Sequence, residues 1–371
     1  MKKFTCPYCY GVHDLVTSGL KCSYNIPGRS DKCVTTVVKD KDGWIPNQDK
    51  PKCFKCTAAR KSIYCNVVNK EVPTDYLSGE NLSIALLGAK ASGKSNYIGV
   101  LVNEIRKKMT SSFNCTLSLS CSEESKEYYD RHYYEPLFKH GRVVEATSQD
   151  EIPPLIFPLR FLDNKNRITK VAALSFYDTA GENLDSTDDI LVSNRYIPNA
   201  HGIILLLDPL QIPAIREKLQ GKIPLPAQNT DATEILSRVV QNIRDVKNIK
   251  GTIKTPIALV FTKIDALEEN DILPEGSCLR EESEHLRRGM FVQSDFENVN
   301  IEMKDILENW VDNELEQLLK NFQKYALFGL TSLGGVPNGE KLSTTKINPR
   351  RVLDPLLWLF AENKYIKTVK K

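Results

Sequence analysis

The sequence predicts an α/β fold: a mostly parallel sheet with one antiparallel strand and helices on both faces, preceded by a small cysteine-rich module. From residue 82 onward, short apolar runs alternate with longer amphipathic stretches, as is typical of strands and helices that alternate around a parallel sheet. Two of the apolar runs are separated only by the polar turn 163–167, which indicates a hairpin and therefore one antiparallel strand. The first 66 residues are rich in cysteine and show little helical periodicity.

Changes in composition divide the chain into three segments. Residues 1–66 form the cysteine-rich module, residues 67–81 a linker, and residues 82–371 the α/β domain with insertions. Apolar runs of strand length predict strands at 82–87, 154–162, 169–178, 202–208, 256–262 and 325–331. Apolar residues at helical spacing predict helices near 94–109, 231–248, 302–323 and 352–362.

Composition argues against several classes of protein. The 50 Lys and Arg residues against 47 Asp and Glu residues leave a formal net charge of +3, which gives no electrostatic footprint for nucleic acid. No apolar stretch follows Met1, so a secretory signal is not expected. The most apolar run, 203–207, is too short to cross a bilayer. We therefore expect a soluble, cytoplasmic protein with no membrane partner.

Residues 88–95 (GAKASGKS) match the phosphate-binding pattern GxxxxGK[ST] between an expected strand and an expected helix. Glycines let the backbone N–H groups point at phosphate oxygens, and the helix presents its positive end to the same anion. Lys94 is expected to reach the β- and γ-phosphates, and Ser95 to ligate Mg²⁺. An ordinary strand–helix turn is the alternative. The residues expected to contact the nucleotide here are Gly88, Ala91, Ser92, Gly93, Lys94, Ser95 and Asn96.

The run 178–182 (DTAGE) follows the apolar part of another expected strand. The carboxylate of Asp178 suits Mg²⁺, and the Gly181 N–H can donate to a γ-phosphate. If this loop contacts only the γ-phosphate, hydrolysis removes its contact and frees the loop to change conformation.

The run 262–265 (TKID) ends a further expected strand. The acceptor-only carboxylate of Asp265 can receive both the N1–H and the exocyclic amine of guanine. Adenine lacks donors in that arrangement, so the run favours GTP over ATP. Thr262 and Lys263 are expected to help hold the base loop. The alternative for this motif alone is an ordinary helix start.

With the three motifs in this order, residues 82–362 resemble the translation-factor-like (TRAFAC) class of P-loop GTPases. The whole chain, including the closing segment 354–359 (DPLLWL), resembles the prokaryotic double-GTPase family, whose members carry an N-terminal zinc module. The resemblance implies GTP/GDP and Mg²⁺ as ligands and places Ser332 and Leu333 beside the guanine. It also implies a role in bacterial conflict or antiviral defence, often beside a second GTPase.

Three positions depart from the common pattern of these GTPases. Glu182 stands where hydrolytic members often have a water-orienting Gln, which predicts slow intrinsic hydrolysis. Thr262 stands where most members have Asn. Lys90 stands where Gly is common, and it either supplies a cation in cis at the γ-phosphate or points to solvent.

The spacing from the first motif to the second is long, so the first switch is expected to carry an insertion. Thr147 in that insertion is the candidate Mg²⁺-sensing residue, with an ordinary loop threonine as the alternative. The candidate catalytic residues are Lys94, Glu182, Lys90 and Thr147, and the candidate Mg²⁺ ligands are Ser95, Thr147 and Asp178.

The N-terminal module holds two Cys-x-x-Cys pairs, whose spacing predicts a closed, structural four-thiolate Zn²⁺ site formed by Cys6, Cys9, Cys53 and Cys56. Cys22 and Cys33 can join either this site or a second one. Cys65 begins a pair whose second position is Val68, so a complete second site would need His13 or an unusual ligand. Disulfides and a redox pair are the alternatives; a reducing compartment and the lack of a βαβ context argue against them.

Three functions are consistent with these features. The first is a GTPase switch, slow alone and stimulated by a protein partner such as a second GTPase or an effector. The second is a GTP-bound scaffold that does not hydrolyse its nucleotide. The third is a zinc-ribbon nucleic-acid adaptor with a regulatory G domain, which the balanced charge disfavours.

Overall fold

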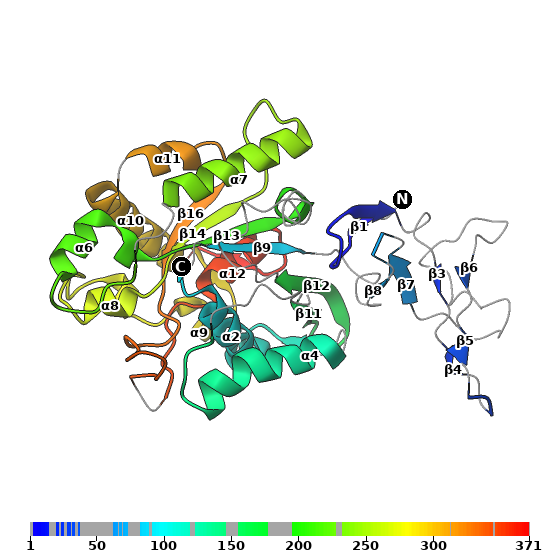
Figure 1. Ribbon diagram of the computed structural model, residues 1–371. Coiled ribbons are helices and arrows are strands. Elements are labelled where there is room, and N and C mark those ends of the chain that lie inside the picture. Colours follow the sequence, from blue (N-terminus) through cyan, green and yellow to red (C-terminus); the bar gives the residue numbers. More distant parts are fainter. Residues whose placement is uncertain are drawn as a thin grey trace.

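A computed structural model gives the fold of the chain. It describes residues 3–14, 20–21, 24–25, 28–30, 32–33, 36–37, 62–65, 67–68, 70–72, 82–88, 91–118, 123–145, 155–176, 195–227, 232–311, 313–343 and 346–370. In these ranges the chain forms an α/β domain with small β-ribbons N-terminal to it (Figure 1).

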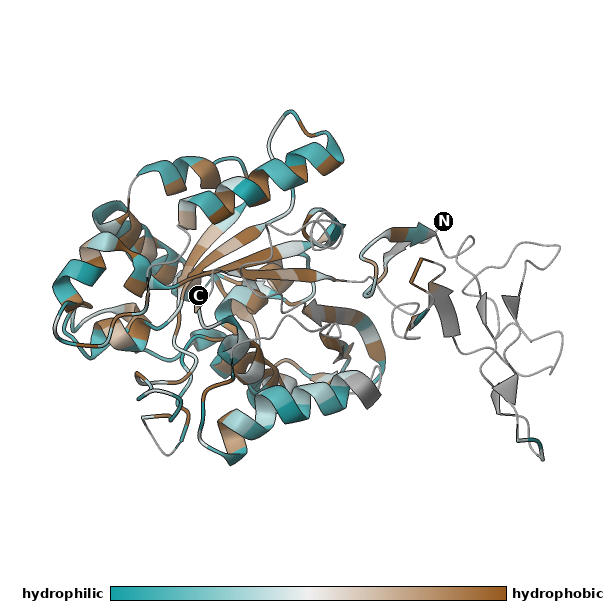
Figure 2. Ribbon diagram, in the orientation of Figure 1, coloured by the Kyte–Doolittle hydropathy of each residue, from teal (hydrophilic) through white to brown (hydrophobic). Residues whose placement is uncertain are grey.

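A parallel sheet forms the centre of the α/β domain. Its strands, in spatial order, are β16 (Tyr325–Gly329), β14 (Ile257–Phe261), β13 (Gly202–Leu207) and β9 (Ile84–Gly88). Every residue of β13 and β14 is buried. These strands are apolar on both faces because helices cover both, and Figure 2 shows them as a hydrophobic centre.

An antiparallel sheet continues the domain beyond β9. It contains β10 (Cys115–Leu117), β11 (Leu155–Leu162) and β12 (Ile168–Phe176), in that order. The predicted hairpin is β11–β12, with Leu155 opposite Phe176, and β12 lies beside β9. β10 was not expected from the sequence.

Helices cover the parallel sheet on its two sides. In Figure 1, α7 (Ala232–Lys247) and α11 (Asn313–Leu319) lie above it, and α2 (Lys94–Glu104) and α12 (Asp354–Glu362) lie below. α10 (Gln293–Trp310) packs against β16. The remaining elements of the domain are η1 (Ile105–Met109), α3 (Thr110–Ser112), α4 (Glu123–Tyr129), η2 (Asp130–Lys139), η4 (Pro209–Gln211), α6 (Pro213–Leu219), α8 (Ile264–Glu268), η5 (Cys278–Arg280), α9 (Glu284–Arg288), β15 (Phe291–Val292) and β17 (Thr368–Val369).

Short strands form the N-terminal ribbons. They are β1 (Lys3–Thr5), β2 (Val12–Asp14), β3 (Leu20–Lys21), β4 (Tyr24–Asn25), β5 (Lys32–Cys33), β6 (Thr36–Val37), β7 (Ser62–Cys65) and β8 (Lys70–Val72). β1 pairs with β2, and β7 pairs with both β3 and β8. The strands described in this part of the chain are only two to four residues long. Such short strands bury few side chains, so the ribbons need a further source of stability.

The helix expected at 302–323 is two helices in the structure. α10 begins earlier, at Gln293, and ends at Trp310, where Val311 takes an extended conformation. α11 then carries Leu315 and Leu319 into the core. Helical spacing of apolar residues continues across the break, which is why the sequence pattern does not reveal it. None of the helices in the described ranges is both long and apolar enough to cross a membrane.

Candidate nucleotide and metal sites

The phosphate loop follows β9 and leads into α2. Gly88 ends the strand, and a Cβ there would meet the Ser92 Oγ at 2.5 Å and the Leu206 carbonyl oxygen at 3.1 Å, so only glycine fits. Ala91 and Gly93 both have positive φ, 62° and 83°. These left-handed residues curl the backbone immediately before the N-terminus of α2, as an anion-binding loop requires.

Two side chains of this loop are almost completely buried. Lys94 is 8% exposed and Ser92 1%. The Ser92 Oγ has no hydrogen-bond partner among the described residues. A buried hydroxyl without a partner is costly, so a polar ligand at this loop would satisfy it.

The 262–265 motif is bonded directly to the phosphate loop. The Thr262 hydroxyl donates to the Ser92 carbonyl oxygen at 2.8 Å. The Lys263 ammonium donates to the Ala91 carbonyl oxygen at 2.9 Å and to the Asp208 carboxylate at 2.6 Å. Thr262 therefore fixes the two loops relative to each other, although the sequence pattern favours Asn at its position.

Asp208 is a site residue that the sequence analysis missed. It follows β13 directly, and its carboxylate is completely buried beside Lys263. The sequence signal for Asp208 is its place directly after the apolar run 203–207, at the carboxyl end of a predicted strand. In the structure this strand lies between β9 and β14, so its carboxyl end lies beside both loops.

Asp265 lies in the first turn of α8 and is 7% exposed. Burial raises the pKa of its carboxyl group, and hydrogen bonds from the Thr331 hydroxyl and from the Gly335 and Ala266 N–H groups act in the opposite direction. The carboxylate is thus held in place by the loop after β16. Thr331, one residue before the expected Ser332, makes this contact.

The loop after β16 is held by the segment that returns toward α12. Asn348 N–H donates to the Leu333 carbonyl oxygen at 3.0 Å. Thr331 pairs with Arg350, whose guanidinium contacts Glu268 of α8. Ser332 is 9% exposed and lies in this supported loop.

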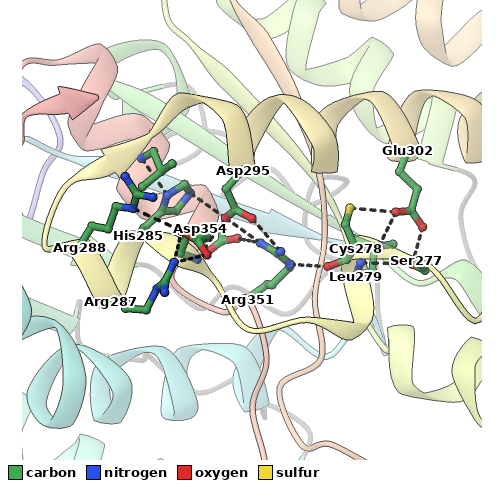
Figure 3. A network of polar contacts seen from close by, with 12 residues as sticks. Ser277, Cys278, Leu279, His285, Arg287, Arg288, Asp295, Glu302, Arg351 and Asp354 are labelled. Atoms are coloured by element: carbon green, nitrogen blue, oxygen red, sulfur yellow. Dashed lines mark hydrogen bonds and ion pairs between the residues drawn. The ribbon is translucent and has the colours of Figure 1, made fainter. Parts of the chain in front are cut away.

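A buried polar network lies on the next residues of that segment (Figure 3). The Arg351 guanidinium contacts Asp295 of α10 at 3.0 Å and Asp354 of α12 at 2.9 Å. His285 joins these carboxylates in a group with metal-binding potential. The guanidinium already forms ion pairs with both carboxylates, so we interpret the network as an anchor for the segment and not as a cation site.

Several predicted nucleotide residues lie outside the described ranges, so their places in the site stay predictions. They are Lys90, Thr147, Asp178, Gly181 and Glu182. β12 ends at Phe176, immediately before that DTAG run. Asn96 is described: its Oδ1 accepts from the Val144 N–H at 2.9 Å and so ties α2 to the insertion.

Four donor atoms from the N-terminal ribbons lie together: the thiols of Cys6, Cys9 and Cys65 and the imidazole of His13, all within 4.8 Å of one another. The Cys9 Sγ lies 3.0 Å from the His13 Nε2 and 3.6 Å from the Cys65 Sγ. A tetrahedral Zn²⁺ with Zn–S bonds of about 2.3 Å needs donors spaced by about 3.8 Å. The cluster therefore has the size and donor set of a closed zinc site.

The three thiols of the cluster are buried. Cys6 is completely buried, Cys65 is 1% exposed and Cys9 8%. The hydrogen bond from Cys6 lowers the pKa of Cys9 to about 4, and the same contact raises the pKa of Cys6. All three cysteines are free thiols, which sets aside a disulfide among them.

This grouping differs from the expected four-thiolate site. Cys6 and Cys9 come together with His13 and Cys65, which the sequence analysis had assigned to a second site. Cys53 and Cys56 lie outside the described ranges, as does Cys22, and only the backbone of Cys33 is described. Among the described residues, β7 brings Cys65 to the β1–β2 hairpin from far along the chain. The pairing with Cys53 and Cys56 stays a prediction.

The chain is similar to several known proteins, among them the following three. The chain is similar to "Putative ESX-1 scaffolding and assembly protein SaeC" of Mycolicibacterium smegmatis, with 24% identity over 80% of this chain and 78% of that protein. It is similar to the Arl6 small GTPase of Trypanosoma brucei, with 11% identity over 77% of this chain and 99% of that one, at a TM-score of 0.32. It is also similar to the GTPase-like domain of Ski7 from S. cerevisiae, with 15% identity over 76% of this chain and 50% of that one, at a TM-score of 0.36. The structural likenesses are too low to add to the account of the site.

A family model gives the firmest result. The model for Double-GTPase 2 matches residues 82–321, which contain the phosphate loop and the 262–265 motif. The match covers more than half of the chain. The chain therefore belongs to the Double-GTPase 2 family.

Proposed function

We propose that this protein is a GTP-binding switch that hydrolyses GTP slowly with Mg²⁺ and is stimulated by a protein partner in the cytoplasm. The observation that carries the proposal is the direct bonding of the 262–265 motif to the phosphate loop, through Thr262 to Ser92 and Lys263 to Ala91. A base-selecting carboxylate and a phosphate loop that are fixed relative to one another can bind the base and the phosphates of one nucleotide. Asp265 supplies the acceptors that match guanine.

In this proposal Lys94 and the backbone around Gly93 hold the phosphates, and Ser95 and Asp178 hold Mg²⁺. The metal supplies charge neutralisation at the β- and γ-phosphates when it is bound. The left-handed loop and the buried Ser92 hydroxyl fit this use.

Replacing Lys94 by Ala should abolish Mg²⁺-dependent nucleotide binding. The ammonium would make charge-assisted hydrogen bonds to phosphate, each worth roughly 1.5–3 kcal/mol, so we expect affinity to fall by about 100-fold or more. Lys254→Ala, which removes an exposed lysine, is the matched control and should bind like the wild type. The measurement is equilibrium titration with a fluorescent GDP; equal affinities of the two variants would rule out the phosphate loop as the site.

Slow hydrolysis follows from Glu182, whose charge opposes the anionic transition state. A cation near the γ-phosphate offsets that charge, and one supplied by a partner accelerates turnover by roughly 10³–10⁵ in related chemistry. If Lys90 acts in cis, Lys90→Ala should reduce single-turnover hydrolysis and leave GTP affinity nearly unchanged. Equal turnover of wild type and Lys90→Ala, alone and with a partner, would remove Lys90 from the mechanism, and fast turnover of the isolated chain would overturn the slow switch.

A second candidate function is a nucleotide-dependent scaffold. The printed name of the SaeC relative describes scaffolding and assembly, which favours a protein partner over a nucleic acid. A scaffold that binds GTP without hydrolysing it would show nucleotide-dependent partner capture and no phosphate release. The resemblance to double-GTPases implies a role in bacterial conflict or antiviral defence. We propose that the partner in that role is a second GTPase.

We further propose that Cys6, Cys9, His13 and Cys65 hold one structural Zn²⁺. The donor set, its spacing and its burial support this. Metal binding would then supply folding free energy that the short ribbons lack.

A further inference from the structure

The loop that carries the metal-binding cysteines packs directly against the α/β domain. The ring of Tyr10 lies 4.6 Å, centroid to centroid, from the ring of Tyr196. The Asn199 side chain donates to the Tyr10 carbonyl oxygen at 2.9 Å. Tyr10 is 2% exposed and belongs to the main hydrophobic core, although it is part of the N-terminal ribbons. Tyr10 is therefore the residue through which the metal site touches the GTPase domain.

The position of Tyr10 is set by the metal ligands. Its φ is 53°, a conformation that non-glycine residues adopt only when their surroundings hold it. The Tyr10 N–H donates to the Cys6 carbonyl oxygen, and the Cys6 N–H donates to the Gly11 carbonyl oxygen, both at 2.9 Å. A Cβ on Gly11 would lie 3.4 Å from the Cys9 Sγ, so this turn wraps closely around the donor atoms. A metal that cross-links these donors fixes the turn and with it the ring of Tyr10.

Tyr196 connects this contact to the strand that leads into the phosphate loop. Its hydroxyl donates to the Ile84 carbonyl oxygen at 2.8 Å and accepts from the Leu86 N–H at 3.1 Å. The helical turn 195–199 is therefore held between β9 on one side and Tyr10 on the other. Along the chain, the same turn begins at Arg195, C-terminal to the DTAG run of residues 178–181.

We propose that the metal state of the Cys/His cluster regulates the nucleotide preference of the GTPase domain through the contact between Tyr10 and the turn 195–199. This inference rests on the proposed GTP and Zn²⁺ sites. With the metal bound, Tyr10 covers Tyr196 and holds the turn against β9. Loss of the metal frees the ligand loop, uncovers the turn and loosens its contact with β9, the strand that leads into the phosphate loop.

The coupling should favour the GTP state. Switch segments of GTPases become ordered around the γ-phosphate and are released without it. The DTAG run is the expected γ-phosphate contact and the turn lies C-terminal to it in the chain, so we expect a looser turn to cost GTP binding more than GDP binding. Coupling of this kind is reciprocal: if the metal strengthens binding of a GTP analogue, the analogue strengthens metal binding by the same factor.

The test uses the full chain with zinc bound or removed by a chelator, with zinc content checked by elemental analysis. Affinities for GDP and for a non-hydrolysable GTP analogue are measured by fluorescence titration. We expect zinc removal to weaken binding of the analogue by about fivefold or more and binding of GDP by less than about twofold, in the usual range of allosteric coupling. The zinc affinity, measured by competition with a chelating dye, should be higher with the analogue bound than without nucleotide, by the same factor by which zinc strengthens analogue binding.

Two variants locate the effect at the proposed contact. Tyr10→Phe keeps the ring and should keep the response, whereas Tyr10→Ala should still bind zinc and lose the response. Asn199→Ala changes the other side of the contact without altering the ligand loop, and it should reduce the response by more than half.

An undiminished response in both Tyr10→Ala and Asn199→Ala would overturn the inference. So would equal nucleotide affinities of zinc-loaded and zinc-free wild type, a result that leaves the proposed GTP function standing. Absence of guanine-nucleotide binding by the zinc-loaded protein would overturn both.

Discussion

Asp265→Asn should lower the affinity for GTP and GDP by about 100-fold or more and raise the affinity for xanthosine nucleotides. The carboxylate accepts two hydrogen bonds from guanine, and bonds to a charged group contribute roughly 1.5–3 kcal/mol each. An amide cannot accept both, but it matches the base edge of xanthine, which offers an acceptor where guanine offers the exocyclic amine. The measurement is competition between GDP and XDP for a fluorescent nucleotide.

Asp271→Asn is the matched control for this change. Asp271 is exposed and follows α8, so the same substitution there alters charge near the site without touching the base pocket. It should keep GTP affinity within about twofold.

The pH dependence of GTP binding gives a second readout: burial raises the pKa of Asp265, so protonation should begin at a higher pH than for an ordinary aspartate. GTP affinity should therefore fall as the pH is lowered, because the protonated carboxyl loses an acceptor. If Asp265→Asn bound GDP as tightly as Asp271→Asn, Asp265 would not be the base reader.

Replacing Cys65 by Ser, or His13 by Ala, should remove one zinc ion per chain. Zinc binding of this type contributes apparent free energies of about 10–16 kcal/mol in small modules, so loss of a ligand should unfold the N-terminal ribbons. We expect faster proteolysis N-terminal to residue 82, while the α/β domain keeps its fold because its hydrophobic core, apart from Tyr10, comes from residues after 81. Elemental analysis and limited proteolysis make the measurement.

Cys278→Ser is the control, since Cys278 is a free, partly buried thiol outside the cluster. It should retain the full zinc content. His13→Ala separates the two ligand sets: it releases zinc from the cluster of the structure and would leave a site made of Cys6, Cys9, Cys53 and Cys56 intact. Full zinc content in His13→Ala would therefore contradict the cluster.

The features of the fold that could be predicted from the sequence are those that depend on residues close together in the chain. The phosphate loop is readable because Gly88, Gly93 and Lys94 are required at fixed spacing between a strand and a helix. The first and last residues of the six predicted strands lie within a few residues of those of β9, β11, β12, β13, β14 and β16. Continuous apolar runs are typical of strands covered on both faces, so the sequence reveals them.

The parts that the sequence did not predict depend on contacts between distant residues. Spacing alone could not show that Cys65 returns to Cys9 and His13, since β7 sets that contact. The role of Thr331 depends on how the loop after β16 meets α8. The break at Val311 is invisible to periodicity because apolar residues continue on both sides of it.

The most direct test of the GTP-binding switch is nucleotide selectivity of the full wild-type chain in the presence of Mg²⁺. Competition titrations with GTP analogue, GDP and the matching adenine nucleotides compare the four affinities in one experiment. The structure predicts tight binding of both guanine nucleotides and binding of adenine nucleotides weaker by about 100-fold or more, because Asp265 finds no matching donors on adenine. Equal binding of ATP and GTP analogues, or no nucleotide binding by folded protein, would contradict the proposal.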